Sequence, residues 1–285
     1  MYVMLKIRNG RLEDCVDLLT VYMGTHWEKG LTTVEEVKDL HRGSNFFRWG
    51  WLVAEIDNRV VGEIIFRTER NPRTGKLGLI RDIGVDVRYQ KQSVGKALTR
   101  AAEEILREKE VSRIIADSPP EAYNFWMKIN YFSRGELVRI QCNPKDVPSR
   151  RSRIVKTCEV NDLQSMPRSM RFSNISHPGL LVDTASSIID GKKKGSILRF
   201  TTDDECIGFG AIISNNGSGS EFIADVTPSG EDYADLIIAK TAKFASKWKS
   251  KNVASRIPKD QLSRFMEVTD WSLETDRQIP VTRLM

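Results

Sequence analysis

Apolar positions in the first half of the chain predict alternating strands and helices. Residues 5–8 favour a short strand. Two helical patterns follow, and the second opens at Thr33 with Glu36 three residues later, as in a capping box. Residues 51–56 and 60–66 are apolar runs separated by a tight polar turn, which is typical of an antiparallel hairpin.

A further strand and a long helix extend this pattern. Residues 77–87 continue the meander, and the apolar stripe along residues 95–109 predicts an amphipathic helix. Asn130 tolerates the left-handed conformation and is expected to end a later helix. The last elements predicted are a strand, that helix and a final strand, at residues 113–116, 121–129 and 137–141. The predicted fold class is α/β (α+β), with a mixed, mostly antiparallel sheet flanked by helices.

The second half repeats the first weakly. Residues 203–208 match residues 57–62 in their charged turn and the apolar-Gly pair that follows. An amphipathic pattern at residues 236–248 takes the place of the long helix, and Phe265–Trp271 has the aromatic spacing of Phe125–Tyr131. Two copies of one fold are predicted, the second diverged. The alternative is a generic α/β domain with coincident spacing.

Prolines and a Ser/Arg-rich run separate the halves. Pro144 and Pro148 precede residues 149–153, a composition typical of a linker. The length of 285 residues also favours two domains, because single cores stop growing near that size. The predicted parts are a first domain, a linker and a second domain, at residues 1–143, 144–153 and 154–285.

Composition narrows the function classes. The formal net charge of +6 favours anionic partners, but Lys and Arg are scattered among acidic residues. The one basic cluster, residues 150–156, is interpreted as a solvated linker rather than a nucleic-acid patch. Four cysteines lie far apart without a CxxC pair, so Cys15 and Cys206 are expected to be buried free thiols, and no metal is expected.

The chain shows no targeting signal. Its first six residues are too short and polar for a signal peptide, and no apolar run approaches the roughly 18 residues of a membrane span. A cytoplasmic protein with no membrane partner is expected. The three histidines, His26, His41 and His177, are isolated, and an exposed or hydrogen-bonded role is preferred for each.

The segment with the clearest chemistry is residues 82–98, where a strand ends, a turn with few bulky side chains follows, and a helix starts. Backbone N–H groups at such a helix start point outward at the positive end of the dipole and can hold a pyrophosphate. Gly95 allows close approach of the backbone, and Ser93 can donate a hydrogen bond. Lys91 and Lys96 add positive charge. The alternative is an ordinary helix N-terminus.

This segment resembles the acyl-CoA loop of the GNAT acetyltransferases, whose pattern is Arg/Gln-x-x-Gly-x-Gly/Ala. Gln90, Ser93 and Gly95 occupy the marked places, with serine where glycine is usual. Residues 52–62 resemble the family's central hairpin, and residues 122–131 its Ala-x-x-Phe-Tyr-x-x-x-Gly-Phe helix. The resemblance covers the first predicted domain. It implies an N-acetyltransferase that takes acetyl-CoA as co-substrate and acetylates a primary amine of a small molecule or protein.

The resemblance places acetyl-CoA in a cleft between two parallel strands that splay apart, here those ending at Val85 and Ala116. A backbone N–H near Val85 would hold the oxyanion of the transition state. The residues expected to bind the cofactor are Ile83, Gly84, Val85, Val87, Gln90, Lys91, Gln92, Ser93, Val94, Gly95, Lys96, Ala97, Asn124 and Trp126.

The amine must lose a proton before it attacks the thioester directly. Asp82 is the expected base and Glu63 the second candidate; a structural salt bridge with Arg81 is the alternative for Asp82. Trp126 stands where the family often has a tyrosine acid, and indole cannot supply a proton. Tyr123, one helical turn earlier, is therefore the candidate acid, with packing as its alternative.

The second half is expected to lack a cofactor loop, because Glu231, Asp232 and Asp235 stand where phosphates would bind. Its expected role is a scaffold or a wall of the acceptor site. His26 falls where the family's acceptor-binding loop would lie. Two other functions stay open: a non-catalytic acyl-CoA sensor, and a protein- or nucleic-acid-binding module that kept only the fold.

Overall fold

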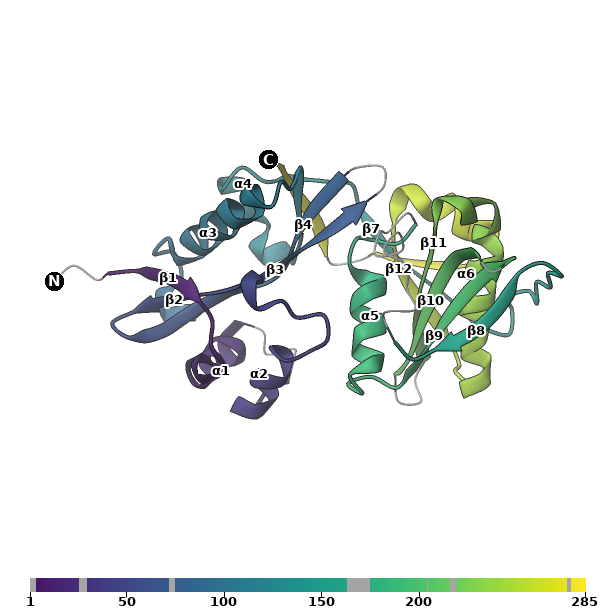
Figure 1. The fold of residues 1–285 in the computed structure, drawn as a ribbon, viewed down its shortest axis with the longest axis horizontal. Coiled ribbons are helices and arrows are strands. Elements are labelled where there is room, and N and C mark those ends of the chain that lie inside the picture. Colours follow the sequence, from purple (N-terminus) through teal and green to yellow (C-terminus); the bar gives the residue numbers. More distant parts are fainter. Residues whose placement is uncertain are drawn as a thin grey trace.

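The computed structural model describes residues 4–25, 30–71, 75–162, 175–203, 205–215, 219–275 and 278–285. Their strands form two seven-stranded mixed sheets, each flanked by helices (Figure 1). The predicted fold class is confirmed.

The elements follow the predicted order closely. The first half contains β1 (Lys6–Asn9), α1 (Cys15–Thr25), α2 (Val34–Leu40), β2 (Trp51–Ile56), β3 (Arg59–Asn71), β4 (Gly75–Val85), α3 (Val94–Glu108), β5 (Arg113–Ser118), α4 (Tyr123–Lys128), β6 (Phe132–Ser133) and β7 (Leu137–Cys142). The second half contains β8 (Lys156–Val160), α5 (Leu180–Ile189), β9 (Gly195–Thr202), β10 (Glu205–Asn215), β11 (Gly219–Val226), α6 (Ala234–Phe244), β12 (Val253–Pro258), α7 (Leu262–Met266), β13 (Ser272–Thr275) and β14 (Ile279–Leu284). Short 3-10 turns precede several helices.

Local sequence signals set several of these boundaries. Asp57 and Asn58 both have positive φ, as the two-residue turn between β2 and β3 requires. The Thr33 side chain accepts a hydrogen bond from the Glu36 N–H at 3.3 Å, which confirms the capping box of α2. Asn130 adopts φ of 67° after α4, as expected.

The last strands of the two halves are exchanged, contrary to the expectation that residues 137–141 complete the first sheet. β7 lies between β12 and β13 in the second sheet, and β14 lies between β5 and β6 in the first. β7 runs antiparallel to β12, with Leu137 opposite Pro258, and β14 antiparallel to β5, with Ile279 opposite Ser118. A local sequence pattern predicts a strand but not its neighbours, so the assembled sheets decide where each strand lies. The domain limits at 143/144 and 153/154 stay a prediction.

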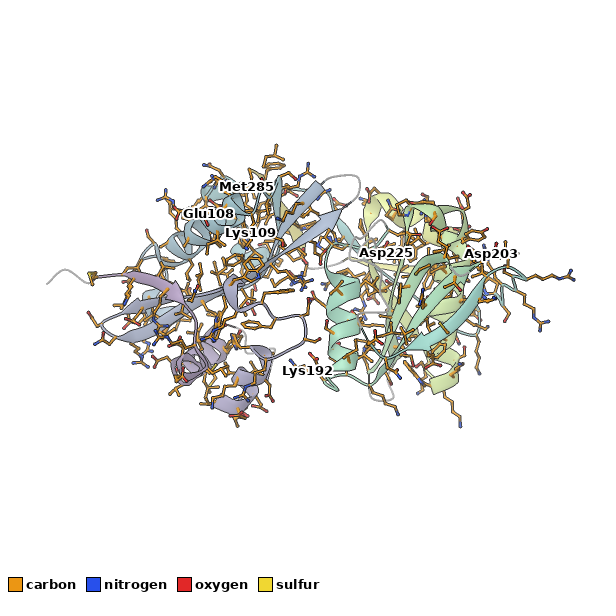
Figure 2. The ribbon with its side chains drawn as sticks, in the orientation of Figure 1. Glu108, Lys109, Lys192, Asp203, Asp225 and Met285 are labelled. Atoms are coloured by element: carbon orange, nitrogen blue, oxygen red, sulfur yellow. The ribbon has the colours of Figure 1, made fainter. Side chains whose placement is uncertain are left out.

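With this exchange, the two sheets have the same strand order. The first reads β1-β2-β3-β4-β5-β14-β6, and the second, from its other edge, reads β8-β9-β10-β11-β12-β7-β13. The predicted repeat therefore extends to the topology, with each half donating its final strand to the other. The Met285 N–H donates to the Ser112 carbonyl at 3.2 Å, shortly after the end of α3, and Figure 2 labels Met285, Glu108 and Lys109.

Two separate hydrophobic cores pack against the two faces of the first sheet. Leu98 and Leu106 of α3 pack with Phe66 of β3 on one face. Leu18 of α1 and Val37 of α2 pack on the other. The first face is called the donor face below, and the second the acceptor face, because α3 carries the predicted cofactor loop and α1 and α2 lie opposite.

Candidate active site

The predicted cleft falls where β4 and β5 part. Their parallel pairing runs from Leu77 opposite Arg113 to Ile80 opposite Ala116. At the next residue, Arg81, a β-bulge interrupts the pairing of β4 with β3. A bulge bends its strand, which accounts for the divergence. In the part of the chain that the structure describes, β4 beyond the bulge pairs only with β3, so its other edge is available to an extended ligand.

The loop after β4 is held in place by its own side chains. Asp86 is 3% exposed, and its carboxylate accepts from the Arg88 N–H and forms a salt bridge with the Arg88 guanidinium. The Gln90 amide donates to the Val85 carbonyl at 3.1 Å. Lys91 has φ of 60°. These contacts fix the turn and bring the backbone round to the start of α3.

The start of α3 presents uncapped N–H groups. Ser93 is the N-cap residue, with φ of 67°, and among the described residues its side chain makes no capping hydrogen bond. The Ala97 N–H donates to the Ser93 carbonyl, so the N–H groups of Val94, Gly95 and Lys96 precede the first helical bond. Three adjacent donors at the positive end of a helix dipole suit an anion.

Positive φ explains why a glycine is usual at the place of Ser93, because serine pays a backbone penalty there that glycine avoids. A glycine at position 95 also has a packing role. A Cβ at this position would lie 3.3 Å from the Phe125 ring, so glycine also allows α3 to pack against α4.

The remaining predicted cofactor residues differ in exposure. Val87, Lys91, Gln92 and Asn124 are exposed beside the loop, whereas Val94 is buried. Trp126 is 2% exposed and packs against Phe125 and Tyr131 with ring centroids 5.1 and 4.8 Å apart. Trp126 therefore fills the core, and a contact of its side chain with cofactor stays a prediction.

The two candidate bases share the acceptor face. Ile65 lies opposite Asp82, and Glu63 is two residues before Ile65 on β3, so all three point to one face. Burial first, and then the charges of Glu63 and Asp82, raise the pKa of Tyr22 well above its ordinary value. Both carboxylates thus act electrostatically on the same phenol, which belongs to the core on their face of the sheet.

Glu63 is already occupied. It is 1% exposed, and its Oε2 accepts from Trp51 Nε1 at 2.8 Å and from His41 Nε2 at 2.9 Å. The other ring nitrogen of His41 donates to the Val37 carbonyl at 2.7 Å, so both nitrogens carry protons. This geometry favours Glu63 as a structural carboxylate.

His41 is a charged core residue. Burial alone lowers its pKa, but hydrogen bonds to Cys15 and Glu63, the charge of Glu63 and the Val37 carbonyl together raise the pKa to about 10. Cys15 is fully buried, as predicted. The sequence analysis found these residues separately but not their contact, because they belong to three different elements.

Tyr123 is the first residue of α4 and packs partly against the donor-face core. It therefore lies across the sheet from Asp82. That arrangement places the candidate acid and the candidate base on opposite faces of the sheet. His26 and Trp27 lie outside the described residues.

The second half contributes side chains to the acceptor face that the sequence did not reveal. Asp183 of α5 accepts from Arg67 at 2.5 Å, from Asn45 at 2.6 Å and from Arg81. Arg67 is 4% exposed and also pairs with Glu69 at 2.9 Å. Arg81 thus pairs with Asp183, and the alternative of a salt bridge between Asp82 and Arg81 stays a prediction.

Asp117, at the end of β5, accepts from His177 of the second half at 2.7 Å. Burial raises the pKa of Asp117, but the charge and hydrogen bond of His177 and nearby Arg81 outweigh this, so the pKa lies below its usual range. Asp117 follows Ala116, where β5 parts from β4. The second half therefore reaches the mouth of the cleft, and His177 is hydrogen-bonded, as preferred.

The second half replaces the candidate bases with apolar residues. Gly208 lies opposite Val226 as Gly62 lies opposite Val85, which aligns the two sheets. In this alignment, Phe209 takes the place of Glu63 and Ile223 that of Asp82. Residues 227–233, which are all described, precede α6 as the loop with Lys91 and Ser93 precedes α3. None of them has the positive φ that Lys91 and Ser93 have.

No helix in the described ranges is long and apolar enough to cross a membrane.

Residues 13–131 match the model of the Acetyltransferase (GNAT) family. The matched span contains β2 to β5, the loop before α3 and all of α4.

Solved structures resemble the whole chain in fold. A GCN5-related N-acetyltransferase from Kribbella flavida has a TM-score of 0.65 at 14% identity, covering 99% of this chain and 71% of that one. A putative acetyltransferase from Pyrococcus horikoshii has a TM-score of 0.61 at 17% identity, covering 100% and 91%. A tandem GNAT protein from the clavulanic acid biosynthesis pathway has a TM-score of 0.57 at 13% identity, covering 99% and 98%. At these identities, the likeness concerns the fold alone.

Proposed function

We propose that this protein transfers an acetyl group from acetyl-CoA to a primary amine, because residues 13–131 match the model of the Acetyltransferase (GNAT) family. One observation carries the proposal: the unpaired edge of β4 leads directly to the three uncapped N–H groups at the start of α3. An extended chain that ends in a diphosphate fits both features at once.

In the proposed reaction, the β4 edge beyond Arg81 binds the pantetheine and positions the thioester at the mouth of the cleft. A backbone N–H near Val85 stabilises the oxyanion. Asp82 accepts a proton from the ammonium group, directly or through water, and the amine nitrogen then forms a bond to the carbonyl carbon.

The carbon–sulfur bond breaks as the tetrahedral intermediate collapses, and the nitrogen loses its second proton to water to give the neutral amide. Tyr123 can donate a proton to the sulfur, or the thiolate can leave unprotonated. Asp82 is preferred to Glu63 as the base because Glu63 is buried and holds two donors.

We assign the second half a supporting role. Apolar residues replace both candidate bases, while Asp183 and His177 contact the acceptor face of the first half. These contacts support a wall beside the acceptor rather than a second active site.

Two substitutions at one position test the cradle. Ser93→Asp places a carboxylate among the uncapped N–H groups, and aspartate tolerates positive φ, so the fold is expected to persist. We expect its Kd for acetyl-CoA, measured by calorimetry, to rise at least about tenfold, since about 1.4 kcal/mol of repulsion suffices. Ser93→Gly is the matched control and should bind at least as well as the wild type. Equal binding by all three proteins would contradict the assignment.

A non-catalytic acyl-CoA sensor is the second candidate. The observation that favours it is buried Trp126 at the place where the family often has a tyrosine acid. Release of CoA thiol in the presence of a broad panel of amines supports the enzyme. Tight acetyl-CoA binding with no thiol release from any amine would support the sensor instead.

A further inference from the structure

The β-bulge in β4 places two charged residues side by side on the acceptor face. Ile80 lies opposite Phe66. Asp82 lies opposite Ile65, which leaves Arg81 between them as the extra residue. Side chains of a regular strand alternate between the two faces of a sheet, whereas a bulge shifts this alternation by one residue. Ile80 packs in the donor-face core, and Arg81 and Asp82 both reach the opposite face.

The contacts of Arg81 show how it lies on that face. Its Nη2 donates to Asp183 of α5, which also accepts from Arg67 at 2.5 Å. Arg67 follows Ile65 by two residues on β3, so its side chain lies on the acceptor face. A Cβ on Gly179, the residue before α5, would lie 3.1 Å from Arg81 Nη1. The second half therefore holds the Arg81 guanidinium against the start of α5.

The charge of Arg81 is compensated only in part and is accessible. Asp183 is shared between Arg81 and Arg67, so it cannot neutralise both. The Arg81 side chain is 26% exposed, whereas Arg67 is buried. Burial raises the pKa of Asp117, but His177 and then Arg81 lower it, so Arg81 also lies near the end of β5. Arg81 is thus an accessible cation at the point where β4 and β5 part.

The neighbouring charges favour one class of acceptor. Consecutive Cα atoms are about 3.8 Å apart, so an amine at Asp82 leaves Arg81 within reach of another group of the same molecule. A second ammonium group would be repelled there, whereas a carboxylate would form a charge-assisted hydrogen bond with the guanidinium. The planar guanidinium also matches the geometry of a carboxylate.

We propose that Arg81 binds a carboxylate of the acceptor, which is therefore an amino acid or another amino carboxylate. The inference rests on the proposed function, in which Asp82 accepts the proton of the amine. Asp183 is a positioning residue: it fixes the guanidinium through Nη2, and an arginine has several further N–H donors for a ligand. The second half then takes part in selecting the acceptor through α5.

The test measures acetyl transfer to free amino acids and to the corresponding amino acid amides, which lack the negative charge. The readout is the acid preference, defined as kcat/KM for an amino acid divided by kcat/KM for its amide, on the full chain with acetyl-CoA. Within one protein, this ratio does not depend on the fraction that is folded. Putrescine serves as an amine that carries a second ammonium group in place of the carboxylate.

Two variants separate binding of the acceptor from the contact between the halves. Arg81→Gln removes the cation. Asp183→Asn is the matched control, because it removes the same salt bridge but keeps Arg81 and an oxygen that can accept its hydrogen bond. We expect Arg81→Gln to lower the acid preference at least about tenfold, as the loss of a charge-assisted contact predicts. Asp183→Asn should keep most of the preference, and the wild type should use amino acids more efficiently than putrescine.

Three results would overturn the inference but leave the proposed function standing. The first is an acid preference that is the same in Arg81→Gln and the wild type, as a purely structural salt bridge of Arg81 would give. The second is an equal fall of the preference in Arg81→Gln and Asp183→Asn. The third is a wild type that prefers putrescine to every amino acid. If no amine releases CoA thiol from acetyl-CoA, the proposed function fails, and the inference fails with it.

Discussion

At the scale of single residues, Asp82 and Glu63 show how surroundings decide the role of a carboxylate. Both lie on the acceptor face next to Tyr22. Glu63 is enclosed and holds a charged histidine and an indole, whereas Asp82 is only partly buried on the strand that borders the cleft. The first arrangement stabilises the fold, and the second suits the role of general base that is proposed for Asp82.

Asp82→Asn should therefore lower kcat by about 10²- to 10⁴-fold, the usual contribution of a general base, with little change in the Kd for acetyl-CoA. Steady-state kinetics and calorimetry check the two parts. Glu63→Gln is the comparison variant and should act mainly on stability. A larger loss of kcat in a folded Glu63→Gln protein than in Asp82→Asn would reverse the assignment.

The His41–Glu63 pair should also make stability depend on pH. The pKa of His41 is raised from 6.5 to about 10, so the folded state holds the proton more tightly than the unfolded state. This contribution is complete below pH 6.5 and is lost as the pH rises through 10. Urea unfolding at several pH values should show stability falling over that range in the wild type. In His41→Gln, the fall should be smaller; an identical pH profile would argue against a charged His41.

At the scale of elements, α2 depends on its capping box. The Thr33 side chain accepts from the Glu36 N–H, and the Glu36 carboxylate accepts from the Thr33 N–H at 2.9 Å. The residue after α2 is His41, so this short helix positions the buried charge.

Thr33→Ala should cost about 1 kcal/mol of unfolding free energy, as for other N-cap losses. Thr32→Ala is the control, because the Thr32 hydroxyl contacts only the Glu36 carboxylate at 3.2 Å and caps no N–H group. Urea unfolding measures both. Equal losses in the two variants would show that the cap itself contributes little.

At the scale of the whole molecule, the strand exchange ties each half to the other. Val281, from the C-terminal strand, is fully buried in the core under α3, and Ile140 is fully buried in the core of the second half. Lys192 adds a surface contact by donating to the Asp39 carbonyl at 2.7 Å, and Figure 2 shows it on the lower side of the molecule.

A substitution in an exchanged strand should therefore destabilise the other half of the chain. Ile140→Ala, which removes about 2–5 kcal/mol of packing, should weaken hydrogen-exchange protection of β11 and β12. Val281→Ala should weaken protection of β4 and β5 instead. Loss of protection confined to the half that carries each residue in sequence would contradict the exchange.

The sequence by itself predicted most elements of the first half and several of the second, but not α5 or β14. Periodicity, the Thr33 capping box and the turn at residues 57–58 act between neighbours in the chain, so they can be read without the fold. The repeat of the first half in the second was also predicted from the sequence, because it rests on the spacing of residues along the chain.

Only the tertiary structure decided which sheet each final strand joins and which residues meet at the cleft. The position of β7 and β14 in the sheets depends on packing against strands from the other half of the chain. Asp183 and His177 reach the acceptor face from more than 50 positions away in the chain, a proximity that no local signal encodes. Local interactions thus set what each segment is, and packing sets what it contacts.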